Sequence, residues 1–156
     1  MGKAQCASCH SGPYFSDQRF YNLGLTEKET RAGIFNGNDR GPAKDLLAAA
    51  ADPLGIASAY SDGDDGRLPA NVGPEYEGAF RTPALRCVSR RPSFMHSGLL
   101  HTLEEVVSFF NRGGDPAGTY QGVGVLTPLG LSSDEEADLV AFLRALDGDA
   151  PIPTFH

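Results

Sequence analysis

The stretch Cys6-Ala7-Ser8-Cys9-His10 decides how the rest of the sequence is interpreted. Two thiols three positions apart, followed directly by an imidazole, form the pattern that attaches a c-type haem. Each thiol of such a pair adds to one haem vinyl group as a thioether, and the adjacent histidine can bring a ring nitrogen to the iron. The motif therefore predicts one covalent haem c on Cys6 and Cys9, with His10 as the proximal iron ligand.

Two other kinds of site share part of this pattern. A zinc site would need ligands from a second cluster, and the only other cysteine, Cys87, is solitary. A thioredoxin-type dithiol would lie at the end of a strand in a βαβ pattern, which this chain does not show. The sequence thus favours haem over zinc or a dithiol, and Cys87 is interpreted as a buried free thiol.

Length and composition predict one domain with long loops. At 156 residues the chain has the length of a single domain, so we expect one domain over residues 1–156. Only 40% of the residues are hydrophobic, and the 19 glycines and 11 prolines favour irregular connections. A buried haem would supply apolar contact that this composition lacks.

Charge and hydropathy narrow the partners and the compartment. A net charge of −7 argues against nucleic acid and anionic membranes as partners, and is compatible with a basic redox partner. No apolar run approaches the roughly 20 residues of a membrane span. The first residues, 1–4, lack the apolar region of a secretion signal. Because haem attachment to this motif normally follows export, we expect a periplasmic protein whose signal is not part of this chain.

Helix signals dominate the predicted regular structure, and no segment alternates as a strand, so the expected fold class is mostly α with long loops. Thr102 and Ser132 are each followed three residues later by Glu, as in a capping box, and an apolar helical face follows each. The first of these faces is expected to comprise Leu103, Val106, Val107 and Phe110. The predicted helices are residues 3–10, 44–51, a segment starting at Thr82-Pro83, 103–112 and 133–146. Residues 61–67 are interpreted as a solvated turn rather than a calcium site.

Four further motifs carry a family resemblance. They are Gly78–Arg86 (GAFRTPALR), Phe94–Gly98 (FMHSG), Thr102–Gly114 (TLEEVVSFFNRGG) and the segment from Leu129 to Leu146. In this order they resemble the C-terminal haem domain of bacterial dihaem cytochrome c peroxidases and their MauG-type relatives. The resemblance covers nearly the whole chain and is weakest over residues 27–75.

The resemblance implies a cytochrome c-like haem domain, normally the second of two. In the typical peroxidases this haem takes electrons from a donor, such as a small cytochrome c or a cupredoxin, and passes them to an N-terminal haem that reduces hydrogen peroxide. A second Cys-x-x-Cys-His is absent from this chain, so the partner haem domain is missing. We therefore expect electron transfer from this domain, and peroxidase activity only as part of a dihaem protein.

The distal side of the iron departs from the family pattern. The position that supplies the sixth ligand in the family, Met in the peroxidases and Tyr in MauG, is occupied by Phe110, which cannot coordinate iron. Either Met95 fills the sixth position or the site is open. A Met95 thioether favours electron transfer, whereas an open site lets the haem itself react with hydrogen peroxide or another small ligand. His96 matches a family histidine near the haem and is expected to form hydrogen bonds.

Two arginines complete the predicted site. Arg81 and Arg86 flank the Thr-Pro-Ala-Leu segment, and a planar guanidinium can bind a haem propionate with two parallel hydrogen bonds. Surface salt bridges are the alternative role for both. The interdomain calcium site of the family is not expected here, because it uses groups from both domains.

Overall fold

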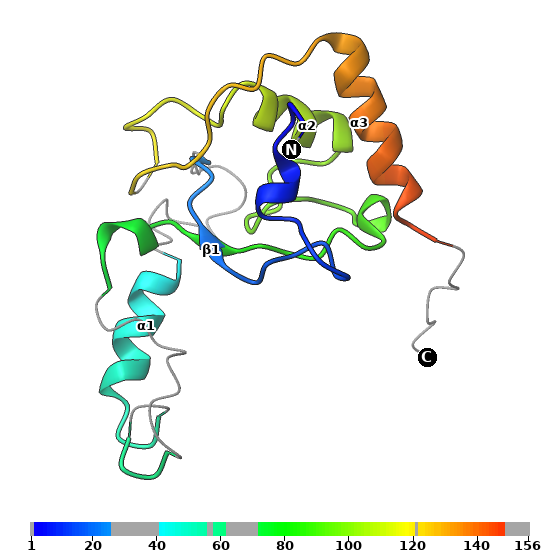
Figure 1. Cartoon of the computed structure of the whole chain (residues 1–156). Helices are drawn as coiled ribbons and strands as arrows, with labels where there is room; N and C mark the ends of the chain where they lie inside the picture. Colours follow the sequence, from blue (N-terminus) through cyan, green and yellow to red (C-terminus); the bar gives the residue numbers. More distant parts are fainter. Residues whose placement is uncertain (1, 26–40, 56–57, 62–71, 121, 149–156) are drawn as a thin grey trace. The chain divides into compact units, whose positions relative to one another are not determined.

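The computed structural model describes residues 2–25, 41–55, 58–61, 72–120 and 122–148 (Figure 1). Its elements are the 3₁₀ turns η1 (Cys6–Ser8), η2 (Pro74–Tyr76) and η3 (Val88–Arg90), the strands β1 (Phe20–Tyr21) and β2 (Phe80–Arg81), and the helices α1 (Pro42–Ala51), α2 (Leu103–Asn111) and α3 (Ser133–Ala145). The helices contain 10, 9 and 13 residues, and irregular connections make up most of the remaining described chain. Long loops are thus confirmed, whereas a mostly α fold is not.

The chain forms two compact units, and each is built from separate stretches of sequence. Unit 1 comprises residues 1–19, 82–113 and 127–156, and unit 2 comprises residues 20–81 and 114–126. The Cys6–His10 motif, α2 and α3 belong to unit 1, and the strands and α1 belong to unit 2. The prediction of one domain over residues 1–156 stays a prediction.

Helix α2 begins at the predicted capping box. The Thr102 hydroxyl accepts a hydrogen bond from the Glu105 N–H (3.0 Å), and the Glu105 carboxylate accepts one from the Thr102 N–H (3.1 Å). These bonds satisfy backbone donors that the first helical turn leaves without partners. The predicted apolar face is partly wrong, because Phe109 is fully buried while Val106 and Phe110 are only half-buried.

Helix α3 begins in the same way and packs against α2 (Figure 1). The Ser132 hydroxyl accepts from the Glu135 N–H (3.3 Å), and the Glu135 carboxylate accepts from the Ser132 N–H (2.8 Å). Between the two helices lies the core of unit 1, which also includes a residue of η3. Its buried members are Val88, Leu103, Val107, Val140 and Leu143. The capping signals in the sequence therefore located both helices that build this core.

Unit 2 contains the short hairpin-like pair of strands. β1 and β2 are antiparallel, with Phe20 opposite Arg81 and Tyr21 opposite Phe80. The buried Asn22 follows β1 and donates from its side-chain amide to the Glu77 carbonyl (2.8 Å). Each strand has two residues, which is too short for an alternating pattern to be visible in the sequence. Helix α1 confirms the prediction for residues 44–51 and starts two residues earlier.

Two predicted helices are wrong. Over residues 3–10 the chain forms only the 3₁₀ turn Cys6–Ser8. No helix starts at Thr82, because this buried residue donates from its N–H (2.8 Å) and its hydroxyl (3.2 Å) to the Arg19 carbonyl instead of capping a helix. Most of the predicted turn over residues 61–67 lies outside the described residues. Among the residues that are described, no helix is long and apolar enough to cross a membrane.

Candidate functional site

The two thiols and the imidazole of the motif lie on one tight turn in unit 1. The His10 N–H donates to the Cys6 carbonyl (2.8 Å), and the Cys9 N–H donates to the same oxygen (3.3 Å). Cys6, Cys9 and His10 are all half-buried, and the thiols are reduced. Burial raises the pKa of the Cys6 thiol. The structure therefore brings together the three residues that the sequence assigned to haem attachment.

The imidazole of His10 is oriented by the main chain. Its Nδ1 atom lies 2.8 Å from the Phe15 carbonyl oxygen. Because a carbonyl oxygen can only accept a hydrogen bond, the ring proton is on Nδ1, and Nε2 carries the lone pair. An imidazole in this state is the form that binds a metal, with its other nitrogen fixed by a hydrogen bond.

The loop that carries the Phe15 carbonyl is closed on itself and tied to a distant part of the sequence. The Phe15 N–H donates to Gly12 (3.0 Å) and the Ser16 N–H to Ser11 (2.9 Å), both to carbonyl oxygens. The Ser16 hydroxyl donates to the Thr82 carbonyl (2.7 Å). The orientation of His10 thus depends on residues more than sixty positions away.

The structure gives Arg86 a contact that the sequence did not predict. Its Nε (2.8 Å) and Nη2 (2.5 Å) both donate to the Pro13 carbonyl, and its guanidinium lies over the Phe15 ring, 5.5 Å from the centroid. Arg81 is on β2 in unit 2 and is exposed. Propionate binding by either arginine stays a prediction. Only a motif covering residues 80–86 pointed to Arg86, and nothing in it indicated contact with the His10 loop.

Met95 lies in a short turn of unit 1. The Phe94 N–H donates to the Leu100 carbonyl (2.7 Å), and the Gly98 N–H donates to the Met95 carbonyl (3.3 Å). Met95 is half-buried and has a φ of 66°. A residue with a Cβ in this left-handed region costs about 1–2 kcal/mol. The turn therefore holds the methionine backbone in a strained conformation, and ligation of iron by Met95 stays a prediction.

The same turn contains a buried hydroxyl that sequence reasoning missed. Among the described residues, the Ser97 Oγ is shielded from solvent and has no hydrogen-bond partner in the protein. A buried hydroxyl normally has a partner, because its desolvation is otherwise costly. His96, its neighbour, is exposed. An unsatisfied hydroxyl beside the candidate axial ligand fits a site that takes a polar group from outside the chain.

Phe110 occupies the position expected to supply the family's sixth ligand. It is half-buried, and its ring packs edge-on against the Phe109 ring, with centroids 5.8 Å apart. A hydrocarbon ring has no lone pair to give to a metal. Within unit 1, Met95 thus remains the candidate thioether ligand.

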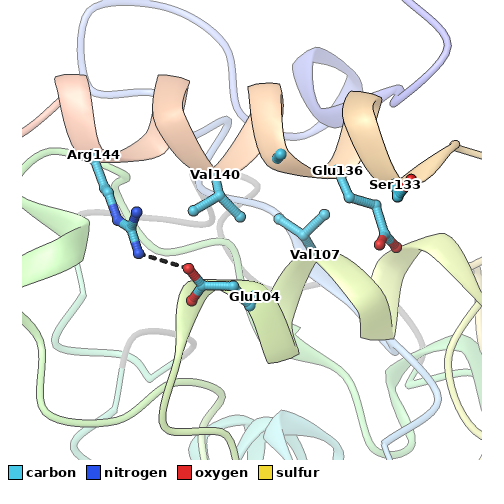
Figure 2. A pocket seen from close by; sticks show the side chains of 7 residues that line it. Glu104, Val107, Ser133, Glu136, Val140 and Arg144 are labelled. Carbon is cyan, nitrogen blue, oxygen red and sulfur yellow. Dashed lines mark hydrogen bonds and ion pairs between the residues drawn. The ribbon is translucent and has the colours of Figure 1, made fainter.

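A pocket of about 260 Å³ between α2 and α3 is a different feature (Figure 2). Figure 2 shows Val107 and Val140 at its centre and the exposed ion pair between Glu104 and Arg144 (2.6 Å) beside it. None of the predicted haem residues lines this pocket. The residues that fit a c-type haem are those of the motif: two reduced thiols and an imidazole with the required tautomer.

Comparison with known proteins shows where this arrangement occurs. No family model matches the chain. It is 40% identical over 160 residues to the cytochrome-c peroxidase IdrP1 of Denitromonas iodatirespirans, covering 97% of this chain and 39% of that protein. It is 32% identical to the methylamine utilization protein MauG of Methylorubrum extorquens, covering 95% of this chain and 32% of MauG.

The fold gives a consistent result. The diheme peroxidase BthA from Burkholderia thailandensis superposes with a TM-score of 0.65 at 23% identity, covering 94% of this chain and 39% of that one. The chain thus spans about two fifths of the length of IdrP1 and of BthA. By sequence similarity over nearly all of its length and by fold, it belongs to the family of bacterial dihaem cytochrome c peroxidases and MauG proteins.

Proposed function

We propose that this chain is a c-type haem oxidoreductase domain that carries one covalent haem and transfers electrons. The observation that carries the proposal is the His10 ring, whose Nδ1 proton is held by the Phe15 carbonyl next to the two reduced thiols. The relatives named cytochrome-c peroxidase and MauG support a haem-based redox role.

The residues of the chain have distinct tasks in this proposal. Cys6 and Cys9 form the thioether bonds, and His10 presents its Nε2 lone pair to the iron. The Phe15 carbonyl keeps the proton on Nδ1, which fixes the ring and raises its basicity as a ligand. The haem, when bound, supplies one-electron redox chemistry that no side chain of this protein can supply.

The place of the domain in a larger reaction follows from what the chain lacks. It has one Cys-x-x-Cys-His motif, whereas the structural relative BthA is a diheme peroxidase. We propose that the domain passes electrons from a small cytochrome c or a cupredoxin to a second haem domain that reduces hydrogen peroxide, in the periplasm. Its net charge of −7 is compatible with a basic donor.

A second candidate function rests on Phe110. Because this residue cannot bind iron, a distal side without Met95 ligation would be open to hydrogen peroxide or another small ligand. The haem of this chain would then react itself instead of relaying electrons. The state of the sixth position separates the two functions.

The test is to mature the chain in a host that exports proteins and attaches haem c. Mass spectrometry should show one haem added, and a pyridine haemochrome spectrum should be that of haem c. An unmodified polypeptide that carries zinc would contradict the proposal. A steady-state assay with hydrogen peroxide and a cytochrome donor should show little turnover, because the second haem is absent. Turnover like that of intact dihaem enzymes would establish the second function.

A further inference from the structure

The loop that orients His10 contains a strained residue. Phe15, whose carbonyl accepts from the His10 ring, has a φ of 50°. The left-handed conformation is unfavourable for a bulky aromatic residue, and such conformations persist only where the surroundings hold them. The contacts of the loop with residues 82–86 should therefore include one that holds Phe15.

Arg86 makes that contact. Its guanidinium covers the Phe15 ring from one side, and two of its N–H groups converge on the carbonyl of Pro13, two residues earlier. The planar fork of arginine allows both contacts at once, whereas the single ammonium of lysine cannot reproduce the two-pronged contact. Since hydrogen bonds from a charged donor are stronger than neutral ones, this is the strongest single attachment of the loop.

We propose that Arg86 is a positioning residue for the proximal ligand: it holds the 12–16 loop so that the Phe15 carbonyl stays bonded to Nδ1 of His10. The inference rests on the proposed haem function, because His10 must be the iron ligand for its orientation to matter. It gives Arg86 a task other than propionate binding. The reduction potential of the haem then depends on an arginine that touches neither the haem nor His10.

The expected consequence has a direction. A hydrogen bond at Nδ1 makes the imidazole a stronger electron donor to the iron and so favours the oxidised state. Loss of Arg86 lets the loop open, weakens this bond and raises the reduction potential. The loop amides of Phe15, Ser16 and Asp17, which donate within the loop, should also exchange with solvent faster.

The experiment compares haem-loaded wild type with Arg86→Ala, Arg86→Lys and the control Arg144→Ala. Arg144 is also exposed and also makes one ion pair in unit 1, but at the α2–α3 pocket. Amide exchange of residues 15–17 should rise about tenfold or more in Arg86→Ala, as expected for the loss of a charged hydrogen bond. The potential should rise in the same variant. Arg86→Lys should recover part of both changes, and Arg144→Ala should match wild type.

Several outcomes would overturn the inference. Wild-type exchange and potential in Arg86→Ala would show that the loop holds itself. A potential that shifts without any change in exchange would assign Arg86 to the propionates instead. If Arg86→Ala does not retain haem, Phe15→Leu removes the ring under the guanidinium and keeps the carbonyl. It should give a smaller rise in exchange, and no rise in this variant would reject the proposal.

The failure of the proposed function would be recognised separately. A wild-type chain that takes up no haem rejects the haem function. The exchange rates of residues 15–17 in the haem-free chain and in its Arg86→Ala variant then still decide whether Arg86 holds the loop. A haem-loaded wild type with unchanged variants rejects only the role of Arg86.

Discussion

The His10 loop and the Met95 turn differ in how unit 1 holds them. The His10 loop is fixed by bonds within itself and by Arg86 and Ser16, which connect it to residues 82–86 and 13. The Met95 turn is closed by two backbone hydrogen bonds and carries its methionine at a positive φ. The difference indicates a preorganised proximal ligand and a distal residue that can exchange. Such an arrangement suits a haem whose sixth position decides between electron transfer and ligand binding.

The largest effect should come from the proximal motif. Replacing both Cys6 and Cys9 by Ser should abolish covalent haem attachment entirely, because no thiol remains to form a thioether. Mass spectrometry of the denatured protein measures this directly. Cys87→Ser is the matched control, since Cys87 contacts only the Asp147 carbonyl through its thiol, and it should keep one haem. A haem retained by the double variant, or lost in Cys87→Ser, would contradict the assignment.

The next effect concerns the distal turn. If Met95 binds the iron, Met95→Ala should convert low-spin ferric haem to high-spin, lower the potential and abolish the weak band near about 695 nm that is typical of His/Met ligation. Met95→Leu separates ligation from packing, because leucine fills a similar volume and cannot bind iron. Loss of the band in both variants supports ligation. A wild-type spectrum and potential in both would show that Met95 only packs in its turn and would favour the open site.

A smaller effect should follow from removing one neutral anchor of the His10 loop. Ser16→Ala eliminates the hydrogen bond to the Thr82 carbonyl and should lower the free energy of unfolding by about 1 kcal/mol. Haem should remain attached, since Arg86 still holds the loop. Chemical denaturation of the haem-loaded protein measures the change, with the exposed Ser8→Ala as a control of the same chemistry. A loss of haem in Ser16→Ala would show that the loop depends on Ser16 more than on Arg86.

The smallest effect is confined to acid and affects the distal side. The Glu105 carboxylate accepts from the His101 N–H (2.6 Å) directly after the Met95 turn and from the Thr102 N–H (3.1 Å). These two backbone bonds, the first above all, lower the pKa of Glu105. A carboxylate with a lowered folded-state pKa stabilises the protein above its unfolded-state pKa of about 4.3, and this contribution is lost as the pH falls through the folded-state value.

Glu105→Gln should therefore melt below wild type at neutral pH, and the difference should disappear in acid. Glutamine mimics the protonated carboxyl, so the two proteins become equivalent once Glu105 is protonated. Glu104→Gln, at the exposed ion pair with Arg144, is the neighbouring control and should show less dependence on pH. A difference between wild type and Glu105→Gln that persists unchanged at low pH would show that the charge is not responsible.

Local signals predicted some parts of this molecule well. The capping boxes at Thr102 and Ser132 and the helix formers of residues 44–51 depend on neighbours within one helical turn, and all three helices are present. The helix predicted from Thr82 failed for a physical reason. The same Thr-Pro pattern that can cap a helix is used here to bind the Arg19 carbonyl, and a partner sixty-three residues away leaves no trace in the local sequence.

The candidate site shows the same division. The sequence by itself determined the type of cofactor, because thioether attachment requires two thiols and an imidazole at fixed spacing, and that spacing is a property of the chain alone. Only the tertiary structure decided the tautomer of His10, the clamp of Arg86 on the Phe15 loop and the unsatisfied hydroxyl of Ser97. These features arise where segments distant in sequence meet. Hydrogen bonds and ring contacts depend on distances of a few ångströms, which the order of residues does not contain.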